Sequence, residues 1–198
     1  MVRYALVSTA ALRAGLTVSY IVANPSSYAY LDGWRPMARA PSTPANATTE
    51  FAPLRDAAKC PTYNDWPYGL ARRVGYSGRL EQDALIRGFV RSPITYLLGD
   101  ADVLPTGVFD ASCPAMAQGD SRLTRGTAFA EYMRSRFNAR HQAVLVPACV
   151  HNVRRIHGRL SCPFARAALP LPLPAKMRTV PTACTDCWRT HNSGCWNR

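Results

Sequence analysis

An apolar run that stops abruptly at a glycine dominates the hydrophobic pattern of this chain. The run extends from Ser92 to Leu98, is rich in β-branched and aromatic residues, and ends at Gly99 with Asp100 and Asp102 directly behind it. A short apolar run bounded by Pro and Gly predicts a strand that is buried on both faces of a sheet. The two acids are therefore expected in the loop at the carboxyl end of that strand.

A second run of the same kind, residues 142–147, is followed by His151. In open α/β sheets, ligands and chemistry gather beyond the carboxyl ends of the strands, so two parallel neighbours would bring an acid and a histidine together. Asp102 lies far enough into its loop to turn back toward a neighbouring strand end, whereas Asp100 abuts the strand and can instead cap the turn. The alternatives without chemistry are loop capping for either acid and a hydrogen-bonded loop histidine for His151.

The remaining periodicity predicts an alternation of helices and strands. Helical spacing covers residues 2–14, 80–90, 121–140 and 162–168, a β-branched run covers 17–23, and residues 105–119 are loop-like. Residues 32–78 are punctuated by Pro and Gly and predict an irregular insertion over the sheet edge, with at most one short helix. This order predicts an α/β domain over residues 1–169 and a disordered Pro- and Cys-rich tail over 170–198.

Charge is distributed unevenly along the chain. The formal net charge is +12, and residues 121–198 hold 13 Lys and Arg against 2 Asp and Glu. Such asymmetry is typical of a polyanion partner, but a general bias toward Arg explains it equally. The predicted helix 121–140 carries an apolar row through Phe129 and Met133, with arginines at 122, 125, 134 and 136 on its other faces.

No apolar run approaches the ~20 residues that a transmembrane helix needs, so we expect no membrane span. Residues 1–23 superficially resemble a signal peptide, but Arg13 interrupts the apolar stretch and no small-residue cleavage site follows. An amphipathic helix followed by a strand is the interpretation we prefer for this segment. The localisation stays open on these grounds.

Seven cysteines leave at least one thiol unpaired if the others form disulfides. In the tail, Cys184, Cys187, His191 and Cys195 have a spacing that resembles a zinc knuckle, with both later gaps one residue short. The alternative function is therefore a basic nucleic-acid-binding protein with a zinc-knuckle-like tail. An unstructured Cys-rich tail is the simpler explanation, and on that view we expect no metal, no cofactor and no nucleic-acid partner.

Five segments together resemble an α/β-hydrolase family of esterase- or lipase-like serine hydrolases. They are residues 18–28 (VSYIVANPSSY), 60–70 (CPTYNDWPYGL), 96–102 (YLLGDAD), 112–119 (SCPAMAQG) and 146–151 (VPACVH). The resemblance covers roughly residues 2–168 and implies a partial α/β-hydrolase fold with about three parallel strands. It also implies that Asp102 matches the acid after the seventh strand and His151 the histidine after the eighth.

In such a site the carboxylate orients the imidazole, which deprotonates a serine that attacks a small-molecule ester. The helix over residues 2–14 matches the one that follows the nucleophile, so the serine is expected just before residue 1. Gly75-Tyr76-Ser77-Gly78 is one residue short of the G-x-S-x-G elbow. We therefore expect this chain to be the C-terminal part of a hydrolase that is inactive alone, with ester hydrolysis belonging to the complete parent.

The resemblance has three further implications. Several members of the family are secreted, which suggests secretion of the parent protein. Members carry cysteines near Cys60, Cys113 and Cys162, so a disulfide among these is expected, with the pair left open. A sheet reduced to its last strands would expose the edge of the strand at Val18, where we expect aggregation or a complementary chain.

Overall fold

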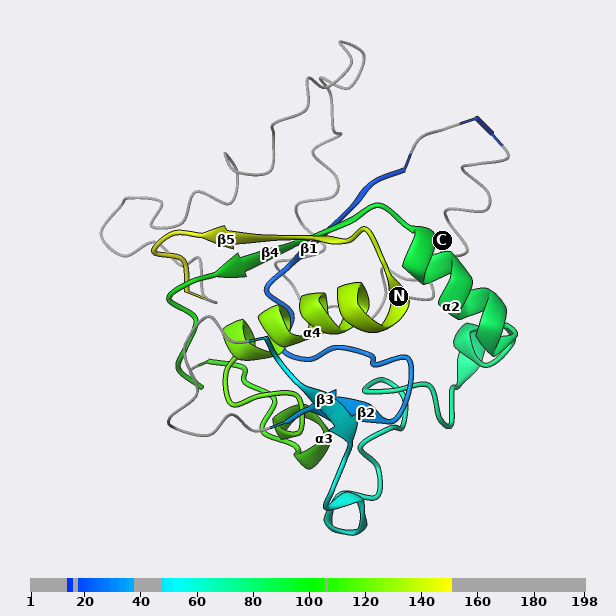
Figure 1. Cartoon of the computed structure of the whole chain (residues 1–198), viewed down its shortest axis with the longest axis horizontal. Helices are drawn as coiled ribbons and strands as arrows, with labels where there is room; N and C mark the ends of the chain where they lie inside the picture. Colours follow the sequence, from blue (N-terminus) through cyan, green and yellow to red (C-terminus); the bar gives the residue numbers. More distant parts are fainter. Residues whose placement is uncertain (1–13, 16–17, 38–47, 106, 151–198) are drawn as a thin grey trace, which may run out of the picture. The chain divides into compact units, whose positions relative to one another are not determined.

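Three segments that lie far apart in the sequence form one parallel sheet in the computed structural model (Figure 1). The structure describes residues 14–15, 18–37, 48–105 and 107–150. Strand β4 (Ile94–Gly99) is central and pairs in parallel with β1 (Tyr20–Ala23) and with β5 (Gln142–Val146). The expected α/β class and the three expected strands are therefore confirmed, with β1 shorter than the β-branched run.

Strand β4 is buried along almost its whole length, as its composition predicts. Its side chains Ile94, Tyr96 and Leu98 alternate along one face and belong to the main hydrophobic core. Strand β5 differs, because its first four residues are exposed at the edge of the sheet. The register nevertheless aligns Gly99 at the end of β4 with Val146 at the end of β5. The two carboxyl ends therefore lie side by side.

Helix α4 (Arg122–Phe137) lies along one face of this sheet (Figure 1). Ser121 caps its N-terminus in a capping box with Thr124, and Asn138 ends it in the left-handed conformation. Phe129 stacks on Tyr28 with ring centroids 4.6 Å apart. A Cβ at Gly126 would overlap the Leu98 side chain, so the glycine lets the helix approach β4 closely.

The segment expected to be an irregular insertion contains regular pieces. Strands β2 (Trp34–Pro36) and β3 (Phe51–Pro53) pair antiparallel, and 3₁₀ turns occur at Ala57–Lys59 and Gly75–Ser77. Figure 1 shows this pair on the side of α4 that faces away from the sheet. Phe51 contacts Tyr132 of α4 at a centroid distance of 5.6 Å. Sequence periodicity missed both strands because three residues are too few to show it.

The other elements follow the prediction with small shifts. Helix α2 (Gln82–Arg91) buries Leu85 and Phe89. The segment expected to be a loop contains the short helix α3 (Cys113–Met116), which begins with Pro114 in its first turn. The helices predicted over residues 2–14 and 162–168 and the tail 170–198 lie outside the described residues. Among the described residues, no helix is both long and apolar enough to cross a bilayer.

Candidate functional site

The two acids behind β4 have different environments. Asp102 is 2% exposed, whereas Asp100 points to solvent. The backbone N–H of Asp102 donates to the carbonyl of Gly99 at 3.2 Å, which closes a tight turn at the strand end. Of the two acids considered from the sequence, Asp102 is the one that the turn directs into the protein.

Two side-chain donors hold the Asp102 carboxylate, one on each oxygen. Asn24 Nδ2 donates to Oδ2 at 2.5 Å, and Arg122 Nη1 donates to Oδ1 at 3.2 Å. Both donors are buried. Because hydrogen bonds from charged and amide groups restrict a carboxylate strongly, Asp102 has one well-defined orientation.

Asn24 comes from the residue directly after β1 and has a left-handed φ of 43°. Its backbone N–H donates to the Leu97 carbonyl at 2.9 Å, and its side-chain oxygen lies 3.4 Å from the N–H of Gly99. Asparagine tolerates this backbone conformation better than most residues. The end of β1 is thereby attached to the turn that carries Asp102.

Arg122 is the first residue of α4 and is fully buried. Its Nη2 donates to the Val108 carbonyl at 2.7 Å, and its guanidinium lies 5.2 Å from the centre of the Phe109 ring. The next N–H of the helix, from Leu123, donates to the Asp102 carbonyl at 3.3 Å. The start of α4 therefore contacts Asp102 through both its backbone and its side chain.

Sequence analysis missed Asn24 and Arg122 as parts of this site. Asn24 was interpreted as turn chemistry before Pro25, and Arg122 as part of a basic helix surface. A cation in the first turn opposes the helix dipole, so Arg122 carried a signal that a local acid compensates it. The expectation that Arg122 and Arg125 lie on the outer faces of the helix is wrong, because both are fully buried.

The chain beyond β5 is bonded to the same turn. The N–H of Asp100 donates to the Val146 carbonyl and the N–H of Ala101 to the Cys149 carbonyl, both at 3.2 Å. A Cβ at Gly99 would overlap the carbonyl oxygen of Cys149, so this approach needs glycine. Cys149 is buried and disulfide-bonded. His151, two residues further on, lies outside the described residues, and its pairing with Asp102 stays a prediction.

The serine of the incomplete elbow motif has a structural contact. Ser77 is buried and its hydroxyl donates to the Val74 carbonyl at 2.6 Å. No apolar strand leads into this turn, which belongs to the 3₁₀ segment Gly75–Ser77. Its geometry agrees with the interpretation that Ser77 is not a nucleophile.

A second polar cluster lies after β1, around Asp110. Its carboxylate accepts hydrogen bonds from the hydroxyls of Tyr68 at 2.8 Å and Ser112 at 2.6 Å, and its N–H donates to Ser26. Burial acts to raise the pKa of Asp110, but the hydrogen bonds from Ser112 and Tyr68 outweigh it and lower the pKa below its ordinary value. The cluster fixes the loop before α3, where the disulfide Cys60–Cys113 also lies.

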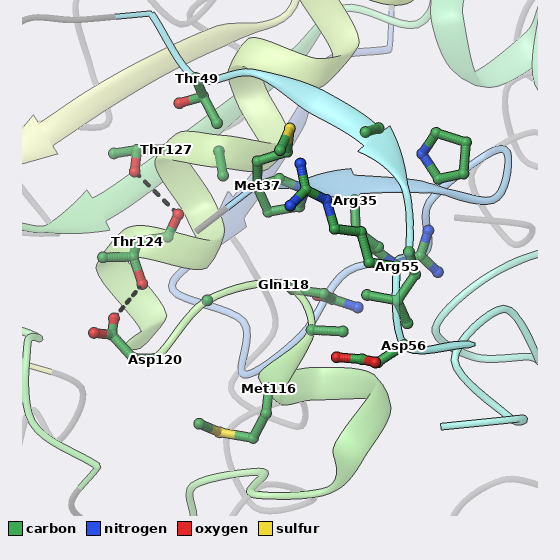
Figure 2. A pocket seen from close by; sticks show the side chains of 17 residues that line it. Arg35, Met37, Thr49, Arg55, Asp56, Met116, Gln118, Asp120, Thr124 and Thr127 are labelled. Carbon is green, nitrogen blue, oxygen red and sulfur yellow. Dashed lines mark hydrogen bonds between the residues drawn. The ribbon is translucent and has the colours of Figure 1, made fainter. Parts of the chain in front are cut away.

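Figure 2 shows a cavity of about 710 Å³ between the β2–β3 pair, α3 and α4. Asp120, Thr124 and Thr127 form one wall, and Met116 and Gln118 lie at its base. Asp102, Asn24 and Arg122 are not among its lining residues. The cavity is therefore separate from the candidate site, and we base no functional argument on its size.

The described residues contain no group of three or more His, Cys, Asp or Glu side chains that could hold a metal ion. Cys184, Cys187, His191 and Cys195 of the zinc hypothesis lie outside the described residues. The disulfide Cys60–Cys113 is one of the pairs that the resemblance allowed, and it is confirmed.

No protein-family model matches the chain, and no curated protein matches it. Two solved structures resemble it weakly. The first is poly(aspartic acid) hydrolase-1 from Sphingomonas sp. KT-1, with 24% identity and a TM-score of 0.43 over 68% of this chain and 40% of that one. The second is LpqC, a poly(3-hydroxybutyrate) depolymerase from Bordetella parapertussis, with 22% identity and a TM-score of 0.42 over 67% of this chain and 36% of that one. The chain thus spans about two fifths of the length of these two proteins, which are a hydrolase and a depolymerase.

Proposed function

We propose that this chain carries the acid–histidine part of a serine-hydrolase-type site, with Asp102 as the acid and His151 as the base. The observation that carries the proposal is the buried, doubly held carboxylate at the end of β4. A triad acid needs this kind of environment, because it must hold one tautomer of the imidazole and stabilise the imidazolium that forms.

The path of the chain after β5 supports the same proposal. Cys149 contacts the turn that carries Asp102 through the bond from Ala101. Two further residues span at most about 7 Å, so covalent geometry keeps the Cα of His151 within that distance of the Cys149 Cα. The His151 side chain can therefore reach the Asp102 carboxylate without any change in the described residues.

The reaction class is ester hydrolysis, which rests on the sequence resemblance. The imidazole would take the proton of a serine hydroxyl, the serine oxygen would attack the ester carbonyl, and the imidazolium would return the proton to the leaving alcohol. The printed sequence holds no G-x-S-x-G elbow. We accordingly expect no turnover of p-nitrophenyl esters and no labelling by a fluorophosphonate probe. Labelling of a serine in the folded chain would contradict this part of the proposal.

The pairing of Asp102 with His151 is tested by an NMR titration of the histidine rings. Asp102→Asn keeps the shape of the side chain but removes its charge, so the titration midpoint of His151 should fall by about one pH unit. Asp100→Asn is the matched control, because it removes an exposed charge from the same turn. His151→Gln assigns the resonance. Equal midpoints in Asp102→Asn and the unmodified chain would rule out the pairing.

A further inference from the structure

The ion pair between Arg122 and Asp102 is buried on both sides. The side chains are 0% and 2% exposed, with Nη1 and Oδ1 3.2 Å apart. Burying two charges costs desolvation free energy that their attraction does not always recover. A surface-exposed helix start would carry an acid rather than a cation. The pair is therefore hard to explain as a contribution to stability alone.

The guanidinium of Arg122 is held independently of the carboxylate. The Val108 carbonyl accepts from Nη2, and the ring of Phe109 lies beneath the cation. Asn24 meanwhile holds the other carboxylate oxygen from the opposite side. The cation has a set position beside Asp102, and its field acts on whatever Asp102 contacts.

We propose that Arg122 is a positioning residue for Asp102, which fixes the rotamer of the carboxylate and weakens the pull of its charge on the paired histidine. The inference rests on the proposed function, because it concerns the same acid–histidine pair. A carboxylate shared with a buried cation stabilises a neighbouring imidazolium less than an unshared one would. The histidine then stays neutral, and able to accept a proton, at a lower pH.

Arg125 provides a matched control one turn further along α4. It is also fully buried and lies over the same ring, 4.3 Å from the centre of Phe109. Its guanidinium donates to the Gly119 and Ser26 carbonyls and to Met116 Sδ instead of a carboxylate. Loss of Arg125 should therefore perturb packing to a similar degree without releasing the charge of Asp102.

The test compares His151 titrations in the full chain carrying Arg122→Gln, Arg122→Lys or Arg125→Gln. We expect Arg122→Gln to raise the midpoint of His151 by roughly half a pH unit, because a cation near the imidazolium is removed. Arg122→Lys should restore the original midpoint, and Arg125→Gln should move it by less than a third as much. A fall, or equal shifts in Arg122→Gln and Arg125→Gln, would overturn the inference.

A double-mutant cycle keeps the test valid where a single variant folds poorly. Arg122→Gln leaves a buried carboxylate without this cation, so Asp102→Asn added to it should recover part of the lost urea midpoint. Asp102→Asn added to Arg125→Gln should recover nothing. Absence of this recovery would contradict the ion pair. Recovery together with an unmoved His151 in Asp102→Asn would instead contradict the proposed function.

Discussion

The buried arginines show how this chain accommodates part of its positive charge. Arg35, Arg122 and Arg125 are each about 1% exposed or less. Arg35 donates to the carbonyls of Asp32, Trp34, Tyr63 and Tyr68, and its guanidinium lies 4.4 Å from the centre of the Tyr30 ring. Carbonyl oxygens and aromatic faces compensate these cations locally. The charge of the described arginines is therefore in part internal, and a high net charge does not imply a basic surface on α4.

His141 is a residue for which the structure predicts a pH dependence of stability. Its Nε2 lies 3.0 Å from the Phe89 carbonyl and its Nδ1 lies 2.9 Å from the Tyr96 hydroxyl. These partners fit the neutral ring, with Nε2 donating and Nδ1 accepting. Burial lowers the pKa of His141 below its ordinary value, and the bond to Phe89 opposes this only in part.

Because the unfolded chain then takes up the proton first, His141 contributes stability above about pH 6.5 that is lost as the pH falls further. Urea denaturation between pH 7.5 and pH 5 should show a steeper loss in the unmodified chain than in His141→Gln. The carboxylates contribute equally to both proteins and cancel in the comparison. Parallel slopes would show that the imidazole titrates alike in the folded and unfolded states.

At the scale of elements, the sheet brings the candidate site together through three strand ends. β1 ends at Ala23 and contributes Asn24, β4 contributes the turn with Asp102, and the chain after β5 bonds to that turn. Periodicity predicted all three strands, because apolar β-branched runs are strong signals even when they are short. It missed β2 and β3, which are too short to show a period and which Arg35 and the neighbouring tyrosines hold in place.

Gly99 is the element-scale residue with the sharpest prediction. Gly99→Ala should destabilise the protein by about 3 kcal/mol, because the added methyl group would overlap the Cys149 backbone and force β4 and the chain after β5 apart. Urea denaturation measures the loss. Asp100→Ala, which changes an exposed side chain in the same turn, serves as the control and should stay within about 0.5 kcal/mol. A similar small change for Gly99→Ala would show that the turn relaxes easily.

At the scale of the whole molecule, the disulfide Cys60–Cys113 ties the segment before α2 to the start of α3. The two cysteines are 53 residues apart, and closing a loop of that length restricts the unfolded chain considerably. The partner chain expected at the edge of β1 stays a prediction, although β1 is an edge strand among the described residues.

Replacing both cysteines by alanine should lower the free energy of unfolding by up to about 4 kcal/mol. Denaturation of the double variant under non-reducing conditions measures the effect while the bond at Cys149 is kept intact. The titration of His151 should not change, because the disulfide does not contact the turn that carries Asp102. A changed midpoint would connect the disulfide to the site.

The sequence by itself determined the α/β class, the three parallel strands, the long capped helix and the importance of the acid behind β4. These depend on local hydrophobic spacing and on cap and turn residues, which act over a few positions along the chain. The tertiary structure decided which acid faces inward, and it brought Asn24 and Arg122 to Asp102 from residues 78 and 20 positions away. It also decided that two arginines of α4 are buried. Such long-range pairings leave no periodic trace, because they arise only when separate elements pack together.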